Sequence, residues 1–222
     1  MARPLKNRAG IGMTSRRTRA RLIERLRERG IGEARVLAAI DKVPRHLFVE
    51  EALASRAYED SALPIGFGQT ISQPYVVARM LEALLFEKPA GKVLEVGTGC
   101  GYQAAVLAQI YREVYSIERI KGLLERARAN LLGLGIANLR LAHGDGRLGL
   151  EPAATFDSII VAAAAMQVPA VLLRQLAPGG RMILPLRNGE TQRLVLIERG
   201  ARGLAETELE EVKFVPLGTG KA

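Results

Sequence analysis

Three glycines and two acids occur in a pattern that can hold a nucleotide-like cofactor. The run Glu95-Val-Gly97-Thr-Gly99-Cys-Gly101 follows a short aliphatic stretch. Glycines at such a turn let the backbone approach a ligand closely. Glu118 follows Gly101 by seventeen positions, close to the spacing at which a Rossmann-type site places an acid on two ribose hydroxyls. A tight turn and a solvated acid are alternative interpretations that spacing alone leaves open.

The spacing of the glycines favours S-adenosylmethionine over a dinucleotide. A pyrophosphate binder needs Gly-x-Gly-x-x-Gly, whereas Tyr102 stands where the last of these glycines is required. S-Adenosylmethionine has no phosphate but carries a sulfonium and an amino group, so an acid such as Glu95 beside the glycines is electrostatically favourable. Asp145 and Gly146 can meet the adenine amino group, although Asp-Gly is equally a turn signal.

Few other side chains offer chemistry. The sequence has one cysteine and two histidines, Cys100, His46 and His143, so neither an internal disulfide nor a zinc cluster is expected. Enzymes that methylate exocyclic base nitrogens resemble one another in an Asn/Asp-Pro-Pro-aromatic motif after the fourth strand, but residues 161–165 read Val-Ala-Ala-Ala-Ala. We therefore expect no metal, and the base-methylating signature is missing.

Strands and helices must bring these residues to one place. Helical patterns that predict an N-terminal cap cover residues 14–29, 33–42 and 46–57. The next segment, residues 63–74, has two Gly and two Pro without a helical period and predicts a surface loop. Pro74 suits the first turn of a helix that runs to about Phe86.

From residue 92 onward, strand and helix patterns alternate. Short aliphatic runs typical of strands buried on both faces cover residues 92–96, 113–117, 139–142, 158–161 and 182–186. Helical patterns lie at residues 102–110, 120–132 and 169–176. Asn188-Gly189 precedes a further run at 194–198 and indicates a hairpin. The predicted fold class is α/β, a doubly wound, mostly parallel Rossmann-like methyltransferase sheet with an N-terminal helical cap and a C-terminal antiparallel hairpin.

Length, composition and charge limit the remaining choices. With 222 residues, 48% hydrophobic and 25% charged, the chain predicts a single globular domain, with a cap and substrate loop at 1–75 and an α/β core at 76–222. Its longest apolar stretch, residues 159–166, is too short to span a membrane. The net charge is +9, and residues 1–35 hold eleven basic and three acidic side chains. The excess of basic side chains therefore lies in the N-terminal arm. We expect a cytoplasmic protein.

Four segments together resemble one family. They are Val-Pro-Arg-His-Leu-Phe-Val at 43–49, Leu-Pro-Ile-Gly-Phe-Gly-Gln-Thr-Ile-Ser-Gln-Pro-Tyr at 63–75, the glycine-rich run at 93–108 and Val-Lys-Phe-Val-Pro-Leu at 212–217. From about Thr18 onward, the chain resembles protein-L-isoaspartate O-methyltransferases. The glycine-rich run is shared by many methyltransferases, whereas the loop at 69–74 is close to diagnostic of this family.

The resemblance implies an activity and a set of site residues. The activity is transfer of a methyl group from S-adenosylmethionine to the free α-carboxyl of an isoaspartyl residue in damaged proteins and peptides, with S-adenosylhomocysteine as product and no metal. It implies that Ser72 is the catalytic serine. The implied cofactor contacts are Thr70, Ile71, Gly97, Gly99, Gly101, Glu118, Arg119, Asp145 and Gly146.

The sequence departs from the family pattern at Phe67, Cys100 and Ala162, where histidine, serine and threonine respectively are common. Alanine at position 162 lacks the hydroxyl that a threonine would place near the site. This loss bears on the rate of methyl transfer or on the range of acceptors. The alternatives are a nucleic-acid (tRNA) methyltransferase, motivated by the basic arm, and a cofactor-binding module without activity. Because the α/β body is nearly neutral, a nucleic-acid partner is not expected. We separately expect a monomer.

Overall fold

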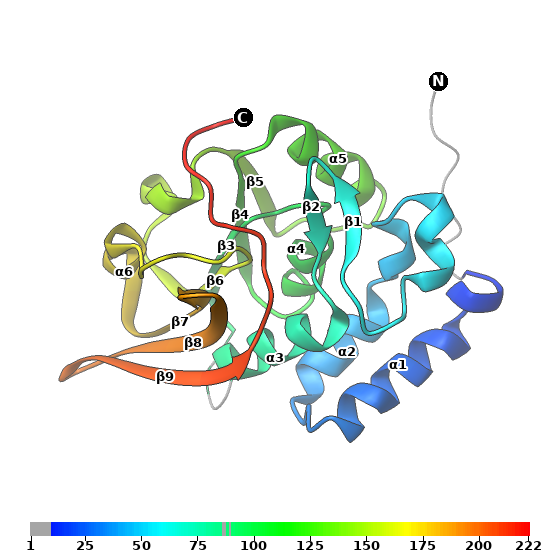
Figure 1. Ribbon diagram of the computed structural model, residues 1–222, viewed down its shortest axis with the longest axis horizontal. Helices are drawn as coiled ribbons and strands as arrows, with labels where there is room; N and C mark the ends of the chain where they lie inside the picture. The colour runs from blue at the N-terminus through cyan, green and yellow to red at the C-terminus, as the bar shows by residue number, and fades with distance from the viewer. Residues whose placement is uncertain (1–9, 86–87, 89) are drawn as a thin grey trace.

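Seven strands of the part of the chain that the structure describes form one sheet, in the order β5-β4-β3-β6-β7-β8-β9 (Figure 1). The computed structural model describes residues 10–85, 88 and 90–222. The sheet strands are β3 (Lys92–Val96), β4 (Glu113–Glu118), β5 (Leu139–His143), β6 (Phe156–Val161), β7 (Leu176–Asn188), β8 (Thr191–Gly200) and β9 (Gly203–Glu211). The strands from β5 to β7 pair in parallel, and β8 and β9 are antiparallel additions. The predicted fold class is confirmed.

The strand order contains a switch point beside the first strand of the sheet. β3 pairs with β4 on one side and with β6 on the other, so the chain reverses its direction of travel across the sheet at β3. Open α/β sheets bind ligands at the carboxyl ends of the strands beside such a reversal. Gly97 follows β3 and Ala162 follows β6, so these two positions mark the expected binding edge.

Helices cover both faces of the sheet because successive residues of its strands point to opposite sides. Ile160 packs in an apolar cluster with the N-terminal helices, whereas Ile159 and Val161 pack on the other face with Leu172 of α6. The helices of the α/β core are α3 (Pro74–Leu85), α4 (Tyr102–Leu107), α5 (Lys121–Leu131) and α6 (Ala170–Gln175). The predicted end of α3 at Phe86 lies outside the described residues.

The N-terminal cap contains α1 (Arg16–Glu28) and α2 (Ala34–Lys42), which bury their apolar faces in the same cluster as α3 and α4. The prediction of one α-helix over residues 46–57 is wrong. Two 3₁₀ helices occupy this stretch, Arg45–Leu47 and Glu51–Arg56, separated by an extended Glu50. Because Phe48 and its two neighbours in sequence are all buried, one face of an α-helix could not accommodate them.

The predicted surface loop at 63–74 is also wrong in part. It contains an antiparallel hairpin of β1 (Leu63–Gly66) and β2 (Gln69–Ile71). Leu63, Ile65 and Ile71 point inward and are at most 4% exposed. The alternation of buried and exposed residues in β1 therefore outweighs the turn signals of its glycine and proline.

The C-terminal strands are longer than predicted, because β7 covers Leu176–Asn188 where the sequence predicts a strand only at 182–186. β7 begins at Leu176, directly after α6 ends at Gln175, and includes Pro178, Gly179 and Gly180. The predicted hairpin about Asn188 is present, and β9 adds a further strand to it. After β9 the chain crosses back over the carboxyl edge of the sheet (Figure 1). There Ala164 N–H donates to Val215 O at 2.8 Å, and Ala222 N–H donates to Arg119 O at 2.7 Å.

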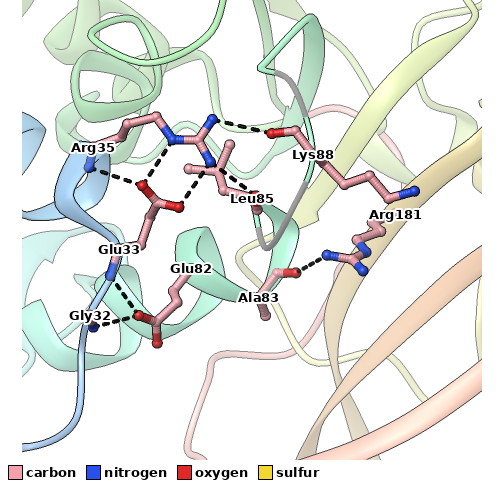
Figure 2. A network of polar contacts seen from close by, with 8 residues as sticks. All are labelled: Gly32, Glu33, Arg35, Glu82, Ala83, Leu85, Lys88 and Arg181. Carbon is pink, nitrogen blue, oxygen red and sulfur yellow. Dashed lines mark hydrogen bonds and ion pairs between the residues drawn. The ribbon is translucent and has the colours of Figure 1, made fainter.

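Polar contacts join the cap to the α/β core (Figure 2). Glu82 of α3 accepts hydrogen bonds from the backbone N–H groups of Gly32 and Glu33 at 2.7 and 3.0 Å, at the start of α2. In return, Arg35 donates to the carbonyls of Leu85 and Lys88 near the end of α3. Each helix thus satisfies backbone groups at an end of the other, which fixes the cap on the core.

Candidate active site

The glycine-rich loop after β3 adopts a conformation that only glycine enters easily. Gly97, Gly99 and Gly101 have φ of +97°, +55° and +90°. Gly97 N–H donates to Ile117 O at 2.9 Å, which continues the pairing of β3 with β4 into the loop. A Cβ at Gly99 would lie 3.2 Å from Ile65 Cδ1 of the hairpin, so the loop fits tightly beneath β1.

Glu118 fixes this loop from the neighbouring strand. Its side chain is 5% exposed, and Oε2 accepts a hydrogen bond from Gly99 N–H at 2.8 Å. Oε1 accepts from Ile120 N–H at 2.9 Å, at the start of α5. Each carboxylate oxygen keeps a further lone pair for a ligand. Glu118 therefore has a structural role, and its contact with the ribose stays a prediction.

The hairpin of β1 and β2 forms a roof over the loop. Arg126 of α5 donates a hydrogen bond to Ile65 O. Phe67 lies at the hairpin turn with φ +54° and packs on Gly122, where a side chain would collide with the phenyl ring. Two contacts with α5 thus hold the hairpin in place.

The C-terminal segment forms a second wall. Arg119 Nε and Nη2 donate to the carbonyls of Gly220 and Thr219, each at 3.0 Å. Asp145 Oδ2 accepts from Gly220 N–H at 2.7 Å, and its Oδ1 accepts from Arg147 N–H at 2.9 Å. The side chains of Arg119 and Asp145 therefore hold the chain end across the sheet edge.

The glycine-rich loop, the hairpin and the C-terminal segment enclose an inner cavity. Of the residues predicted for the site, the cavity brings together Thr70, Ile71, Ser72, Gly97, Gly99, Glu118, Arg119 and Gly146. It does not bring Glu95, Gly101 or Asp145 into its lining. A direct contact of those three with the cofactor stays a prediction.

An outer groove opens beside the inner cavity. It runs between the start of α3 and the segment after β9, and Tyr75 and Phe214 are among its lining residues. The two hollows share four lining residues, which are Thr70, Ser72, Ala162 and Val215. A molecule in the groove can therefore meet a molecule in the cavity only at this junction.

Ser72 lies at the junction without serving the helix that follows it. The sequence leaves helix capping as an alternative role, because Ser72 stands two residues before Pro74. Asp60 performs that function, since its Oδ1 accepts from Tyr75 N–H at 2.9 Å in the first turn of α3. Within the described residues, the Ser72 hydroxyl has no hydrogen bond to protein. It is therefore available to a ligand.

Burial changes the ionisation of two residues near the loop. Glu95 is fully buried, and desolvation raises the pKa of its carboxyl to about 8, against the effect of a hydrogen bond from Ser116. Burial also raises the pKa of the Cys100 thiol to about 11. Cys100 therefore remains a thiol at neutral pH and is not an activated nucleophile. His46 is bonded through Nδ1 to the Tyr58 hydroxyl at 2.8 Å and does not line the cavity.

Sequence reasoning missed several residues of the two hollows. Ile65 and Leu123 line the cavity, and Arg29 lies in the groove with its guanidinium 3.6 Å from the centroid of the Tyr75 ring. The alternation of Leu63 and Ile65 is a local signal for the hairpin, but the glycines and prolines of the segment obscure it. Nothing in the spacing of Arg29 could have placed it beside Tyr75, because the contact joins distant parts of the chain.

The fold and the site together define a class of protein. The cavity lies at the switch point of a doubly wound sheet, and it offers glycine backbone, a buried acid and hydroxyls to one elongated ligand. These features fit S-adenosylmethionine, because Gly97 and Gly99 leave room for close approach and Glu118 retains free lone pairs. The class is that of Rossmann-like methyltransferases.

Comparison with known proteins narrows the class to one family. A model of the protein-L-isoaspartate(D-aspartate) O-methyltransferase family matches residues 17–222. A protein-L-isoaspartate O-methyltransferase of Dechloromonas aromatica is 63% identical over 212 residues, covering 95% of this chain and 98% of its own. One from Chromobacterium violaceum is 57% identical over the full length of both chains. The chain belongs to the protein-L-isoaspartate O-methyltransferase family.

Solved structures agree with the family assignment. A Plasmodium falciparum protein described as a protein-L-isoaspartate O-methyltransferase, in complex with S-adenosyl-L-homocysteine, superposes with a TM-score of 0.77 at 29% identity. The match covers 89% of this chain and 97% of that one. A second protein-L-isoaspartate O-methyltransferase gives a TM-score of 0.82 at 29% identity, covering 90% of this chain and 66% of the other.

The described residues contain neither a metal-binding cluster nor a membrane-spanning helix. No group of three or more His, Cys, Asp or Glu side chains among residues 10–85, 88 and 90–222 is arranged to hold a metal ion. Over the same residues, no helix combines the length and apolar character needed to cross a membrane.

Proposed function

We propose that this chain transfers a methyl group from S-adenosylmethionine to the free α-carboxyl of L-isoaspartyl residues in damaged proteins and peptides, which starts their repair. The observation that carries the proposal is the junction of the inner cavity with the outer groove at Thr70, Ser72, Ala162 and Val215. The cavity is the cofactor site, and the groove receives the acceptor peptide. Family membership supports this division of roles.

The acceptor chemistry explains why the junction holds no general base. A carboxylate with a reference pKa near 4 is already ionised at neutral pH. The bound cofactor supplies the methyl group. The chain has to exclude water and hold the carboxylate in line, a task that orientation alone performs. Ser72 donates a hydrogen bond that orients the carboxylate.

The remaining predicted residues bind the cofactor. Glu118 holds the ribose hydroxyls through the lone pairs that Gly99 and Ile120 leave free. Thr70 and Ile71 approach from the hairpin, and Gly146 lies where the adenine edge is expected. Asp145 and Arg119 act on the C-terminal segment in addition to their predicted contacts.

The apolar end of β6 argues against methylation of a nucleobase. The four alanines after Val161 offer no side-chain acceptor or donor to an exocyclic amine, and Ala163, Ala164 and Ala165 are buried. The family assignment does not favour the tRNA alternative. Steeply salt-dependent binding of nucleic acid would support the tRNA alternative instead.

One assay tests the proposed function. Purified enzyme is incubated with labelled S-adenosylmethionine and with matched isoaspartyl and aspartyl peptides, and base-labile methanol is counted. Label transferred to the isoaspartyl peptide alone is the expected result. Equal labelling of both peptides, or of neither while RNA is labelled, would contradict it.

The working state of the enzyme is a further part of the proposal. We propose that it acts as a cytoplasmic monomer and that the cap and the core form one domain. The single apolar cluster that spans α1 to α4 and the sheet supports the latter. Sedimentation at assay concentration and a single thermal transition are the expected observations.

A further inference from the structure

Glu95 is a buried acid without a partner that matches its charge. It lies in β3 just before the glycine-rich loop and is 0% exposed. Oε2 accepts a hydrogen bond from Ser116 Oγ, whereas Oε1 has no hydrogen-bond partner within the described residues. A buried carboxylate in this state is costly unless it is neutral or meets a cation.

A chain of hydroxyls connects this acid to the cofactor cavity. Ser116 Oγ lies 2.6 Å from Thr98 Oγ1, and Thr98 lines the cavity. On the other side, Gln103 of α4 also lines the cavity. Against the larger effect of desolvation, its side chain acts on Glu95 and lowers the pKa of that carboxyl, although its Nε2 makes no hydrogen bond of standard geometry within the described residues. Glu95 therefore lies one side chain behind the cavity wall, with a polar connection to it.

Among the residues that the structure describes, no positively charged group acts on Glu95. The Glu118 carboxylate at the end of β4 raises the pKa of Glu95. The Cys100 thiol in the glycine-rich loop also interacts with Glu95. From β4 and α4 it faces the neutral Ser116 and Gln103. Desolvation is the largest influence and raises the pKa of Glu95 from 4.5 to about 8, so at neutral pH most molecules carry the neutral acid.

We propose that Glu95 is a proton-linked positioning residue, neutral in the free enzyme and ionised when the cationic cofactor occupies the cavity. This inference rests on the proposed function, because it takes S-adenosylmethionine as the cofactor. On binding, the O–H bond of the Glu95 carboxyl breaks and its proton passes to solvent buffer. Ser116 keeps its hydrogen bond to Glu95 Oε2, which strengthens when the carboxylate becomes charged and so holds Thr98 at the cavity wall. The positive sulfonium of S-adenosylmethionine stabilises the ionised Glu95 carboxylate, whereas the uncharged sulfur of the product S-adenosylhomocysteine does not.

The experiment counts protons released on binding. Calorimetric titrations at about pH 6.5 in two buffers of different ionisation enthalpy give the protons released per cofactor bound. For the wild type, we expect release approaching one proton with S-adenosylmethionine and clearly less with S-adenosylhomocysteine, which carries the same amino-acid end. In Glu95→Gln, both numbers should fall to near zero. The preference for S-adenosylmethionine over S-adenosylhomocysteine should decrease by about tenfold, because a nearby charge pair is lost.

Wild-type measurements keep the inference testable if Glu95→Gln does not fold. The affinity for S-adenosylmethionine should rise as pH increases from about 5.5 to about 8, and that for S-adenosylhomocysteine should rise less. Equal proton release by the two ligands, or unchanged release in Glu95→Gln, would overturn the inference. Because the readout is binding, tight proton-linked binding without peptide methylation would contradict the proposed function alone. Absence of cofactor binding would contradict both.

Discussion

Replacement of Ser72 by alanine separates an orienting role from a helix-capping role. Asp60, and not Ser72, accepts the hydrogen bond from Tyr75 N–H in the first turn of α3. The Ser72 hydroxyl therefore contributes little to folding, and Ser72→Ala should change the free energy of unfolding by no more than about 0.5 kcal/mol. Loss of one donor aimed at the reacting carboxylate should reduce kcat by about 10² to 10³-fold.

The assay compares initial rates of peptide methylation with thermal unfolding for three variants. Ser72→Thr keeps the hydroxyl and should retain far more activity than Ser72→Ala. Asp60→Ala removes the cap, which costs about 1 kcal/mol and lowers Tm by roughly 2 to 4 °C. A Ser72→Ala enzyme with near-normal turnover and a lowered Tm would refute the reasoning and return the catalytic role to the loop backbone.

Four other changes test separate parts of the structure. Glu118→Ala should weaken binding of S-adenosylmethionine by about 2 to 4 kcal/mol in calorimetry, and unchanged affinity in a folded variant would remove its ribose role. Because the folded-state pKa of Glu95 is raised from 4.5 to about 8, stability should fall as pH rises through that window; Glu95→Gln should therefore raise Tm more at pH 8 than at pH 5, and an equal change at both would contradict the shift. Deletion of residues 1–17 removes the Ser15 cap of α1, so Tm should decrease while peptide methylation stays within a few fold; loss of activity in a variant that still melts cooperatively would place the arm at the site. Asn188 is exposed in the hairpin turn before a glycine with φ +61°, so ageing should produce isoaspartate there in peptide maps; maps that stay clean at Asn188 while other sites convert would contradict this expectation.

The centre of the sheet was predictable because its signals are local. Residues 92–96 are an uninterrupted buried strand followed by glycines, and the acid at 118 ends the next strand. Burial on both faces removes any alternation, and the glycines mark the turn. Gly97, Gly99 and Glu118 therefore line the cavity, and their contacts with the cofactor stay predictions.

The peripheral strands were not predictable in the same way. β9 is an edge strand whose residues are mostly exposed, so its sequence lacks the apolar alternation that identifies a half-buried strand. β1 and β2 have only four and three residues, and glycine and proline obscure their pattern. The contacts of Arg119 with Thr219 and Gly220 join residues about a hundred positions apart, which no local spacing reveals.

The division of the active site between cap and core explains a costly residue in the cap. Arg45 is fully buried, and it donates through Nε to Ala57 O at 2.8 Å and through Nη2 to Ser61 O at 3.4 Å. Its guanidinium lies 5.0 Å from the centroid of the Tyr102 ring at the start of α4. Because burial lowers the pKa of Arg45 more than Asp60 and its other neighbours raise it, this charge is retained at a cost in stability. It joins the segment that leads into the hairpin to the helix that follows the glycine-rich loop. A rigid guanidinium fork suits the alignment of those two elements better than a flexible side chain.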